Sequence, residues 1–269
     1  MAGRRKYLIV VIILFLMAEG LLALGYRFVN SSVLIYMYHS VSEEPISIDS
    51  GYDEPELSVK PSEFEKQLEF FSKRGLKTVF ADELPELDTS RGRYLVLTFD
   101  DGYEDNYTEA FPLLKKYNCK ATIFMITSLI DAPGYLTSDQ IREMTQSGLV
   151  SVQSHTVTHQ PLAWWYRDYD DVVYELGDSK RVLESISGRP VTALSVPNGS
   201  YDSAVMDIAE KYYDVMITGT NLRTYSDKDL MDLQRIGIYR RHKLSDIRRM
   251  TDNRGVYFIK RIFQKLAQD

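Results

Sequence analysis

Short apolar runs alternate with longer amphipathic segments along most of this chain, and this alternation limits its fold more than any other feature. The pattern starts at Asn30 and continues for about 240 residues. The apolar runs have the length of buried strands, and the segments between them have the periodicity of helices. Strands that alternate with helices of ten or more residues pack as parallel β/α units. A continuous stretch of this length favours one β/α barrel over two smaller domains.

Residue types place the individual elements. The expected strands are residues 33–38, 94–99, 121–126, 149–154, 191–196, 215–218 and 236–239. The expected helices are residues 61–74, 108–117, 138–147, 171–187, 203–211 and 256–267. In the first of these helices, Phe64, Leu68 and Phe71 share one face and Gly75 ends the helix. The polar and acidic residues 42–56 are expected to form an exposed loop.

The N-terminus predicts a hydrophobic helix. Three basic residues, Arg4, Arg5 and Lys6, precede an apolar run that extends to Gly25 with an interruption at Glu19 and Gly20. Positive charge before an apolar run keeps that end in the cytoplasm. The 18 residues from Leu8 to Gly25 would form a helix of about 27 Å, barely enough for a hydrocarbon core of about 30 Å.

This run has two interpretations. We favour an uncleaved signal anchor over residues 1–29, which would place the domain of residues 30–269 outside the cell on a single-pass membrane protein. The alternative is a signal peptide cleaved near Ala23-Leu24-Gly25, which would release the same domain as a secreted protein. Both interpretations place residues from about 30 onward outside the cytoplasm.

Charge and cysteine content exclude other classes of protein. The net charge of −6 argues against a nucleic-acid partner. Cys119 is the only cysteine, so the chain can form neither an intrachain disulfide nor a zinc site built from several thiolates.

Two adjacent carboxylates, Asp100 and Asp101, close the apolar strand that starts at Tyr94. The carboxyl ends of barrel strands carry the chemistry in such folds. Neighbouring carboxylates are unfavourable there unless a cation or a catalytic role compensates. Successive strand residues point to opposite sides, so both can face one site only if the strand end twists, which Gly102 allows.

A pair of histidines follows another strand. His155 and His159 are four residues apart, a spacing that puts both on one helical face, where they can converge on a metal ion. Surface or helix-capping histidines are the alternative. With Asp101 at a neighbouring strand end, two imidazoles and one carboxylate make a metal triad that leaves positions open for water and substrate.

Two further strand ends carry candidate residues. The segment from Ser195 to Tyr201 contains Pro197-Asn198-Gly199, a turn whose backbone N–H groups could point at a ligand. His39 follows the strand of residues 33–38. A single histidine at such a position is more often structural than catalytic.

The order of these segments resembles the polysaccharide deacetylase family, the NodB-homology domain of carbohydrate esterase family 4. The matching segments are Tyr38-His39-Ser40-Val41, Thr98-Phe99-Asp100-Asp101-Gly102-Tyr103, Ser154-His155-Thr156-Val157-Thr158-His159 and Pro197-Asn198-Gly199. The resemblance covers about residues 34–240. It implies a distorted (β/α) barrel of about seven strands, here preceded by the N-terminal hydrophobic helix. The early segment that contains His39 resembles the branch of the family that includes poly-N-acetylglucosamine deacetylases, in which the general-acid histidine precedes the Asp-Asp motif.

The resemblance also implies roles for individual residues. Asp100 is the expected catalytic base and His39 the expected general acid. Asp101, His155 and His159 are the expected ligands of a divalent metal, usually zinc. The N–H of Asn198, after Pro197, is expected to help hold the oxyanion.

The chain departs from the family pattern at two places. Val196 stands where an aromatic residue usually precedes Pro197, and the arginine that many members place in this loop to steady the base is missing. Arg235 could substitute for that arginine. His242 matches no motif and is interpreted as a surface residue.

The expected activity is hydrolysis of N-acetyl groups on an extracellular or cell-wall polysaccharide of the N-acetylglucosamine type. Poly-N-acetylglucosamine, peptidoglycan and chitin-like chains all stay open as substrates. Trp164, Trp165 and Tyr103 are candidate sugar contacts, although the tryptophans could equally anchor their loop by packing. The alternatives are an O-acetyl esterase on the same fold and a catalytically silent glycan-binding protein at the cell surface.

Overall fold

The computed structural model describes residues 33–45, 55–89, 92–165, 169–219 and 229–252, without the side chains of Trp164 and Trp165. The chain divides into two compact units, residues 32–244 and residues 1–31 with 245–269. The hydrophobic helix expected near the N-terminus and the helix expected at residues 256–267 lie outside the described residues. Within the described ranges, no helix is long and apolar enough to cross a bilayer.

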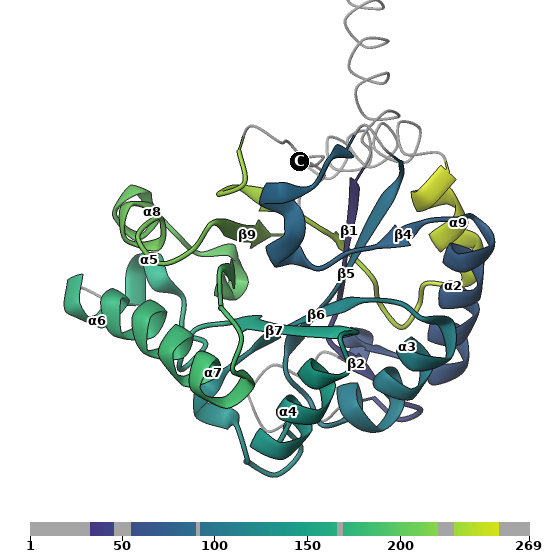
Figure 1. Cartoon of the computed structure of the whole chain (residues 1–269), viewed down its shortest axis with the longest axis horizontal. Coiled ribbons are helices and arrows are strands. Elements are labelled where there is room, and N and C mark those ends of the chain that lie inside the picture. Colours follow the sequence, from purple (N-terminus) through teal and green to yellow (C-terminus); the bar gives the residue numbers. More distant parts are fainter. Residues whose placement is uncertain (1–32, 46–54, 90–91, 166–168, 220–228, 253–269) are drawn as a thin grey trace, which may run out of the picture. The chain divides into compact units, whose positions relative to one another are not determined.

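Nine parallel strands of the described residues form one sheet in the larger unit (Figure 1). They are β1 (Val33–Tyr38), β4 (Lys77–Thr78), β5 (Tyr94–Asp101), β6 (Ala121–Met125), β7 (Val150–Ser154), β8 (Ala193–Ser195), β9 (Val215–Gly219), β10 (Leu233–Gln234) and β11 (Ile236–Gly237). Their order across the sheet is β10-β9-β8-β7-β6-β5-β1-β11, and β4 pairs with the start of β5. Two short strands, β2 (Ser40–Val41) and β3 (Ser58–Val59), pair separately.

One short segment connects the two ends of this sheet. In β10, Leu233 pairs with Ile217 of β9, at one edge. In β11, Ile236 pairs with Tyr36 of β1, at the other edge. Only Arg235 lies between these two strands. The sheet is therefore nearly closed into a distorted barrel, as the sequence predicted.

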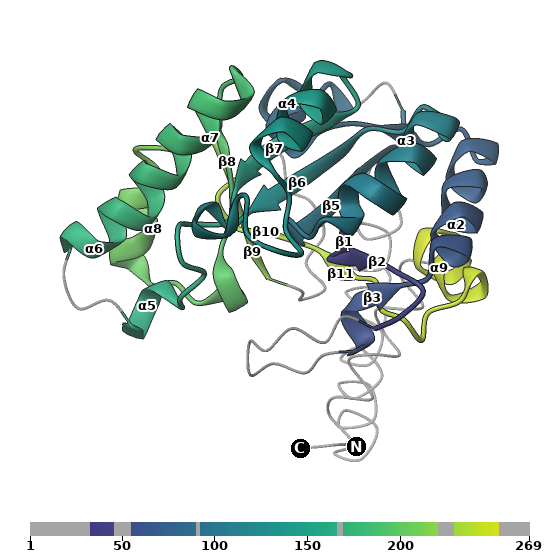
Figure 2. The ribbon, with the colours of Figure 1, turned by 90° about the horizontal axis from the view of Figure 1, so that it is seen from below.

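Helices surround the sheet (Figure 2). The α-helices of the larger unit are α2 (Pro61–Lys73), α3 (Phe111–Tyr117), α4 (Ser138–Gln146), α5 (Leu162–Trp165), α6 (Tyr169–Val173), α7 (Ser179–Ser187) and α8 (Ser203–Ala209). Its 3-10 helices are η1 (Pro55–Leu57), η2 (Ala81–Glu86), η5 (Thr127–Leu129) and η7 (Pro197–Gly199), and its π-helical turns are η4 (Asn106–Ala110) and η6 (Tyr174–Asp178). Helix α9 (Leu244–Asp252) falls mostly in the second unit.

Alternate residues of each strand pack on different layers, as expected for a barrel strand buried on both faces. One core cluster includes Val33 and Ile35 of β1 and Val96 of β5, together with residues of β9 and η2. The intervening residues of β1 meet helix α2, where the ring of Tyr36 lies 5.7 Å from that of Phe71. Continuing the alternation of Val96 along β5 puts Thr98 and Asp100 on the interior side of the sheet.

The long elements confirm the periodicity analysis, and the deviations have local causes. Strand β8 begins at Ala193, two residues later than expected, because the Gln153 side chain accepts the N–H groups of Thr192 and Ala193. Strand β11 ends at Gly237, and the N–H of Tyr239 is instead donated to Nδ1 of His242.

Two expected helices contain π-helical turns. The helix expected at residues 171–187 consists of α6, η6 and α7, and the helix expected at residues 108–117 begins with η4. The two-residue strands β2, β3, β4 and β10 were not expected, because a pair of residues carries no periodicity.

Gly199 ends the 3-10 turn after β8 at a position where a side chain has no space. Its φ is +62°, and a Cβ built there would lie 2.3 Å from the carbonyl oxygen of Thr218. Gly188, which ends α7, has a φ of +64° and nothing within 4 Å of the same position.

These two glycines have similar φ values but different surroundings, so together they test whether the nearby Thr218 carbonyl excludes a side chain at Gly199. Gly188→Ala should lower the free energy of unfolding by about 1 kcal/mol, the lower end of the range for a left-handed non-glycine residue. Gly199→Ala should lower it by roughly 2–3 kcal/mol more, since overpacking adds to the same strain. Urea denaturation of both variants measures the difference, and equal losses would contradict the steric explanation.

Candidate metal centre and catalytic residues

The carboxyl ends of β1, β5 and β7 bring the sequence-predicted residues together. Tyr38 of β1 pairs with Phe99 of β5, so His39 follows beside Asp100. Asp101 pairs with Met125 of β6, and the carbonyl of Met125 accepts the N–H of His155 at 3.0 Å. The parallel register alone thus places all of these residues at one end of the barrel.

Asp100 and Asp101 face the same end of the barrel because the strand turns at its last residue. Asp101 has a φ of +73° and Gly102 a φ of +79°. The expected twist therefore exists, and it begins at Asp101 itself, a conformation that is uncommon for a non-glycine residue and often marks a functional site.

The group of Asp101, His155 and His159 has the geometry of a metal site. Oδ1 of Asp101 lies 3.5 Å from Nε2 of His155 and 3.6 Å from Nε2 of His159. Tetrahedral zinc ligands with bonds of about 2.0–2.2 Å lie about 3.3–3.6 Å apart. Oδ1 of Asp101 is buried and has no hydrogen-bond partner among the described residues. These residues therefore fit a divalent metal ion.

His155 is held in the tautomer that a metal requires. Its Nδ1 lies 2.7 Å from the carbonyl oxygen of Ser195 on β8. A carbonyl only accepts, so Nδ1 carries the proton and Nε2 presents its lone pair to the site. Burial lowers the pKa of His155 to about 3 and also lowers the pKa of His159, so both imidazoles are neutral near pH 7.

The two histidines do not share a helical face, contrary to the sequence interpretation. Residues 155–159 form a loop, in which Thr156 has a φ of +67° and His159 a φ of +63°. Two left-handed residues bend the loop so that the imidazole rings lie 4.7 Å apart. The predicted convergence is present, but the backbone and not helical periodicity produces it.

Asp100 forms a two-point ion pair with Arg235. The two guanidinium nitrogens Nη1 and Nη2 donate to Oδ1 and Oδ2 of Asp100 at 2.6 Å each. They also donate to the hydroxyls of Thr98 and Ser195. Burial alone would raise the pKa of Asp100, but the charge of Arg235 and its hydrogen bonds hold that pKa well below its ordinary value.

Arg235 thus contacts the carboxylate that the sequence analysis expected it to steady. The pair is almost completely buried, with side-chain exposures of 4% for Arg235 and 5% for Asp100. The role of Asp100 as a base stays a prediction.

His39 is half-buried at the end of β1, and its Nδ1 has no hydrogen-bond partner among the described residues. The segment around it is fixed by two side chains from the start of η4. Asp105 accepts the hydroxyl of Ser40 at 2.5 Å and the N–H of Val41 at 3.1 Å. Asn106 donates to the carbonyl oxygen of His39 at 2.8 Å. Sequence reasoning did not single out Asp105 and Asn106, although both lie within three residues of the end of the Asp-Asp-Gly-Tyr segment.

Two further predicted residues, Tyr103 and Asn198, lie on segments next to the metal ligands. Burial and then the charge of Asp101 raise the pKa of Tyr103, and its ring stacks on Tyr135 with centroids 5.4 Å apart. Asn198 lies in η7 with a φ of +54°, two residues beyond Val196 on the strand end that supports His155. Its proposed contact to an oxyanion stays a prediction, as does the sugar-binding role of Tyr103.

The side chains of Trp164 and Trp165 lie outside the described residues, and His242 has a different role from the one expected. Helix α5 contains Trp164 and Trp165, whose side chains lie outside the described structure. His242 is only partly exposed, and its Nδ1 accepts the N–H of Tyr239, so it stabilises a turn and is not a purely surface residue.

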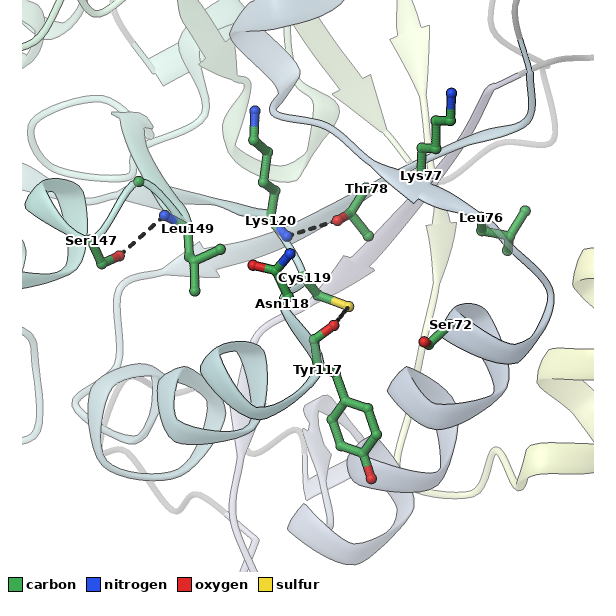
Figure 3. A pocket seen from close by; sticks show the side chains of 11 residues that line it. Ser72, Leu76, Lys77, Thr78, Tyr117, Asn118, Cys119, Lys120, Ser147 and Leu149 are labelled. Atoms are coloured by element: carbon green, nitrogen blue, oxygen red, sulfur yellow. Dashed lines mark hydrogen bonds between the residues drawn. The ribbon is translucent and has the colours of Figure 1, made fainter.

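A pocket of about 560 Å³ lies at the opposite end of the strands (Figure 3). It is lined by residues near the starts of β4, β6 and β7, among them Lys77, Cys119 and Leu149. Burial raises the pKa of Cys119 to about 11, so this thiol is protonated and unreactive. The lining contains no carboxylate and no imidazole, so this pocket is separate from the metal centre.

Comparisons with known proteins match this arrangement. Residues 88–213 match a family model described as polysaccharide deacetylase. A Bacillus subtilis protein named provisionally as the polysaccharide deacetylase YxkH is 34% identical over 209 residues, covering 76% of this chain and 70% of that protein. The Staphylococcus epidermidis poly-β-1,6-N-acetyl-D-glucosamine N-deacetylase is 31% identical over 144 residues, covering 48% of this chain and 50% of the relative.

Solved structures agree with the sequence relatives. The Streptococcus pyogenes deacetylase PplD, solved in complex with acetate, superposes with a TM-score of 0.71 at 30% identity, covering 80% of this chain and 96% of the other. The shared fold, the metal-site geometry and these relatives lead to one conclusion: this chain belongs to the polysaccharide deacetylase family.

Proposed function

We propose that this protein is a metal-dependent hydrolase that removes N-acetyl groups from a polysaccharide of N-acetylglucosamine and releases acetate. The observation that carries the proposal is the position of the metal triad directly beside a carboxylate that is paired with a buried arginine. Two neutral imidazoles and a carboxylate whose Oδ1 has no hydrogen-bond partner among the described residues are the kinds of ligand that a catalytic zinc centre uses. When bound, the metal acts as a Lewis acid toward the acetamido carbonyl and lowers the pKa of water at the site.

The residues of the chain supply the proton transfers. Arg235 keeps Asp100 ionised over the whole working pH range, so that its carboxylate can accept a proton from the attacking water. The leaving amine needs a proton, since an amine anion is too poor a leaving group. His39 is the group that we assign to donate this proton, because it follows β1 directly and lies beside Asp100. The N–H of Asn198 is assigned to stabilise the developing oxyanion.

The relatives support N-acetylglucosamine polymers as the substrate class. The staphylococcal relative is named for poly-β-1,6-N-acetyl-D-glucosamine, and PplD was solved with acetate, the product that our proposal requires. Acetate release from β-1,6- and β-1,4-linked N-acetylglucosamine oligomers, with and without chelator, tests the activity and its linkage preference. Release from O-acetylated sugars alone would favour the esterase alternative.

Substitutions of a metal ligand and of the catalytic base should have different effects on zinc content and on turnover. His155→Ala should lose bound zinc and deacetylase activity together, because it removes a metal ligand. Asp100→Asn should keep one zinc per chain and lose turnover, because it removes a proton acceptor. Metal analysis of the purified variants alongside acetate release measures both effects. One equivalent of zinc retained by the double variant His155→Ala, His159→Ala would contradict the ligand assignment.

His39→Ala should retain the fold and the metal but lose about 10²-fold or more in kcat, the usual range for a positioned acid. The loss should shrink with acetyl substrates whose leaving group needs no proton. Steady-state kinetics with N-acetylglucosamine oligomers and with an activated acetate ester measure the contrast. Wild-type turnover of the oligomers by the variant would move the assignment of the acid to another residue.

We also propose that residues 1–29 anchor the protein in the cell membrane with the catalytic domain outside. The support is the basic segment followed by 18 largely apolar residues. The full-length chain should sediment with membranes and be digested by protease added to intact cells. Recovery of a shortened chain in the medium would instead indicate signal-peptide cleavage.

A further inference from the structure

The loop that carries both metal histidines is held by one buried carboxylate, that of Glu175. Its Oε2 accepts the N–H of Val157 at 2.8 Å and the N–H of Thr158 at 2.9 Å. Its Oε1 accepts the hydroxyl of Thr158 at 2.7 Å. Glu175 therefore satisfies the two backbone N–H groups midway between His155 and His159.

This loop requires external support. Thr156 and His159 both adopt left-handed φ values, and such residues persist only where the surroundings determine their conformation. Within the loop, the hydroxyl of Thr156 accepts the N–H of His159 at 3.1 Å. From outside the loop, the N–H groups of Thr127 and Ser128 are donated to the carbonyl oxygens of Thr156 and Val157. Glu175 is the side chain outside the loop that accepts the N–H groups of Val157 and Thr158.

Glu175 is itself held rigidly. Its residue exposure is 1%, and it lies in the π-helical turn η6 between α6 and α7. The hydroxyl of Ser179 lies 2.7 Å from the carbonyl oxygen of Glu175 and 2.8 Å from the hydroxyl of Ser154, the residue that ends β7. π-Helical turns inside helices frequently occur at functional sites. The hydroxyl of Ser179 thus connects the helix that carries Glu175 to the strand that precedes His155.

We propose that Glu175 is a positioning residue for the metal centre, which raises metal affinity by fixing the loop between His155 and His159. This inference rests on the metal site proposed above. Residues that orient metal ligands from outside the coordination sphere typically contribute 10–100-fold in metal affinity. Glu175 acts through the backbone of the loop and not by contact with the metal.

Two substitutions separate the shape of this side chain from its charge. Glu175→Gln removes the charge but keeps the reach, because its amide oxygen can accept both N–H groups and its NH₂ can donate to the Thr158 hydroxyl. Glu175→Asp keeps the charge but is one methylene shorter. We expect Glu175→Asp to bind zinc about 10–100-fold more weakly than wild type and Glu175→Gln to stay within about threefold.

The measurement is the zinc dissociation constant of the folded, metal-free full-length protein, obtained by competition with a chelator. The visible spectrum of the Co²⁺-loaded protein gives a second readout, which should shift in Glu175→Asp and not in Glu175→Gln. If Glu175→Asp does not fold, Thr158→Val removes only the hydroxyl contact and should weaken zinc binding by a smaller factor in the same direction.

Glu184 on α7 provides the matched control. Its Oε1 accepts the N–H of Val191 at 3.1 Å and pairs with Lys180 at 3.2 Å, away from the metal loop. Glu184→Ala should lower the Tm without changing zinc affinity. Zinc binding by Glu175→Asp equal to wild type, or by Glu175→Gln as weak as by Glu175→Asp, would overturn the positioning role. Absence of zinc binding by the wild type would instead overturn the metal site itself.

Discussion

The buried ion pair between Asp100 and Arg235 is the interaction on which the rest of this structure depends. Removing two charges from water is unfavourable, and their attraction compensates only when the geometry is good and the remaining donors are satisfied. Here both carboxylate oxygens are used, and the hydroxyls of Thr98 and Ser195 take further guanidinium donors. Among the described residues, Nε of Arg235 alone of its nitrogens has no hydrogen-bond partner. Because Arg235 lies between β10 and β11, the contact that closes the sheet also sets the charge state of Asp100.

Strain in the backbone is concentrated at the same end of the barrel. Of the non-glycine residues with positive φ in the described chain, Asp101, Thr156, His159 and Asn198 lie in the predicted site segments. Such conformations are unfavourable by about 1–3 kcal/mol each. The neighbouring carboxylates Asp105 and Glu175 hold the segments next to them through hydrogen bonds to backbone N–H groups and hydroxyls. Hydrogen bonds from polar side chains thus stabilise loop conformations that apolar packing alone would not favour.

The parts that the sequence could predict are those with a repeating pattern. Apolar runs and amphipathic helices located the long strands, and the ends of those strands located Asp100, Asp101 and His155. Contacts without a local signature were harder to find. The pairing of Arg235 with Asp100 spans 135 positions and was suggested only by a missing family residue. Glu175 was missed, because a glutamate within a helix normally faces solvent, and the spacing of the two histidines suggested a helix where left-handed residues make a loop.

The position of Arg235 also has a consequence for how the protein is made. During synthesis, both aspartates of β5 leave the ribosome more than a hundred residues before the arginine that neutralises one of them. Until residues 233–237 join the two edges of the sheet, the carboxylates have no guanidinium partner and favour contact with water over burial. The ion pair of Asp100 with Arg235 can therefore form only when nearly the whole domain has been translated, and the compensated burial of Asp100 arises with that last step of assembly and not gradually along the chain.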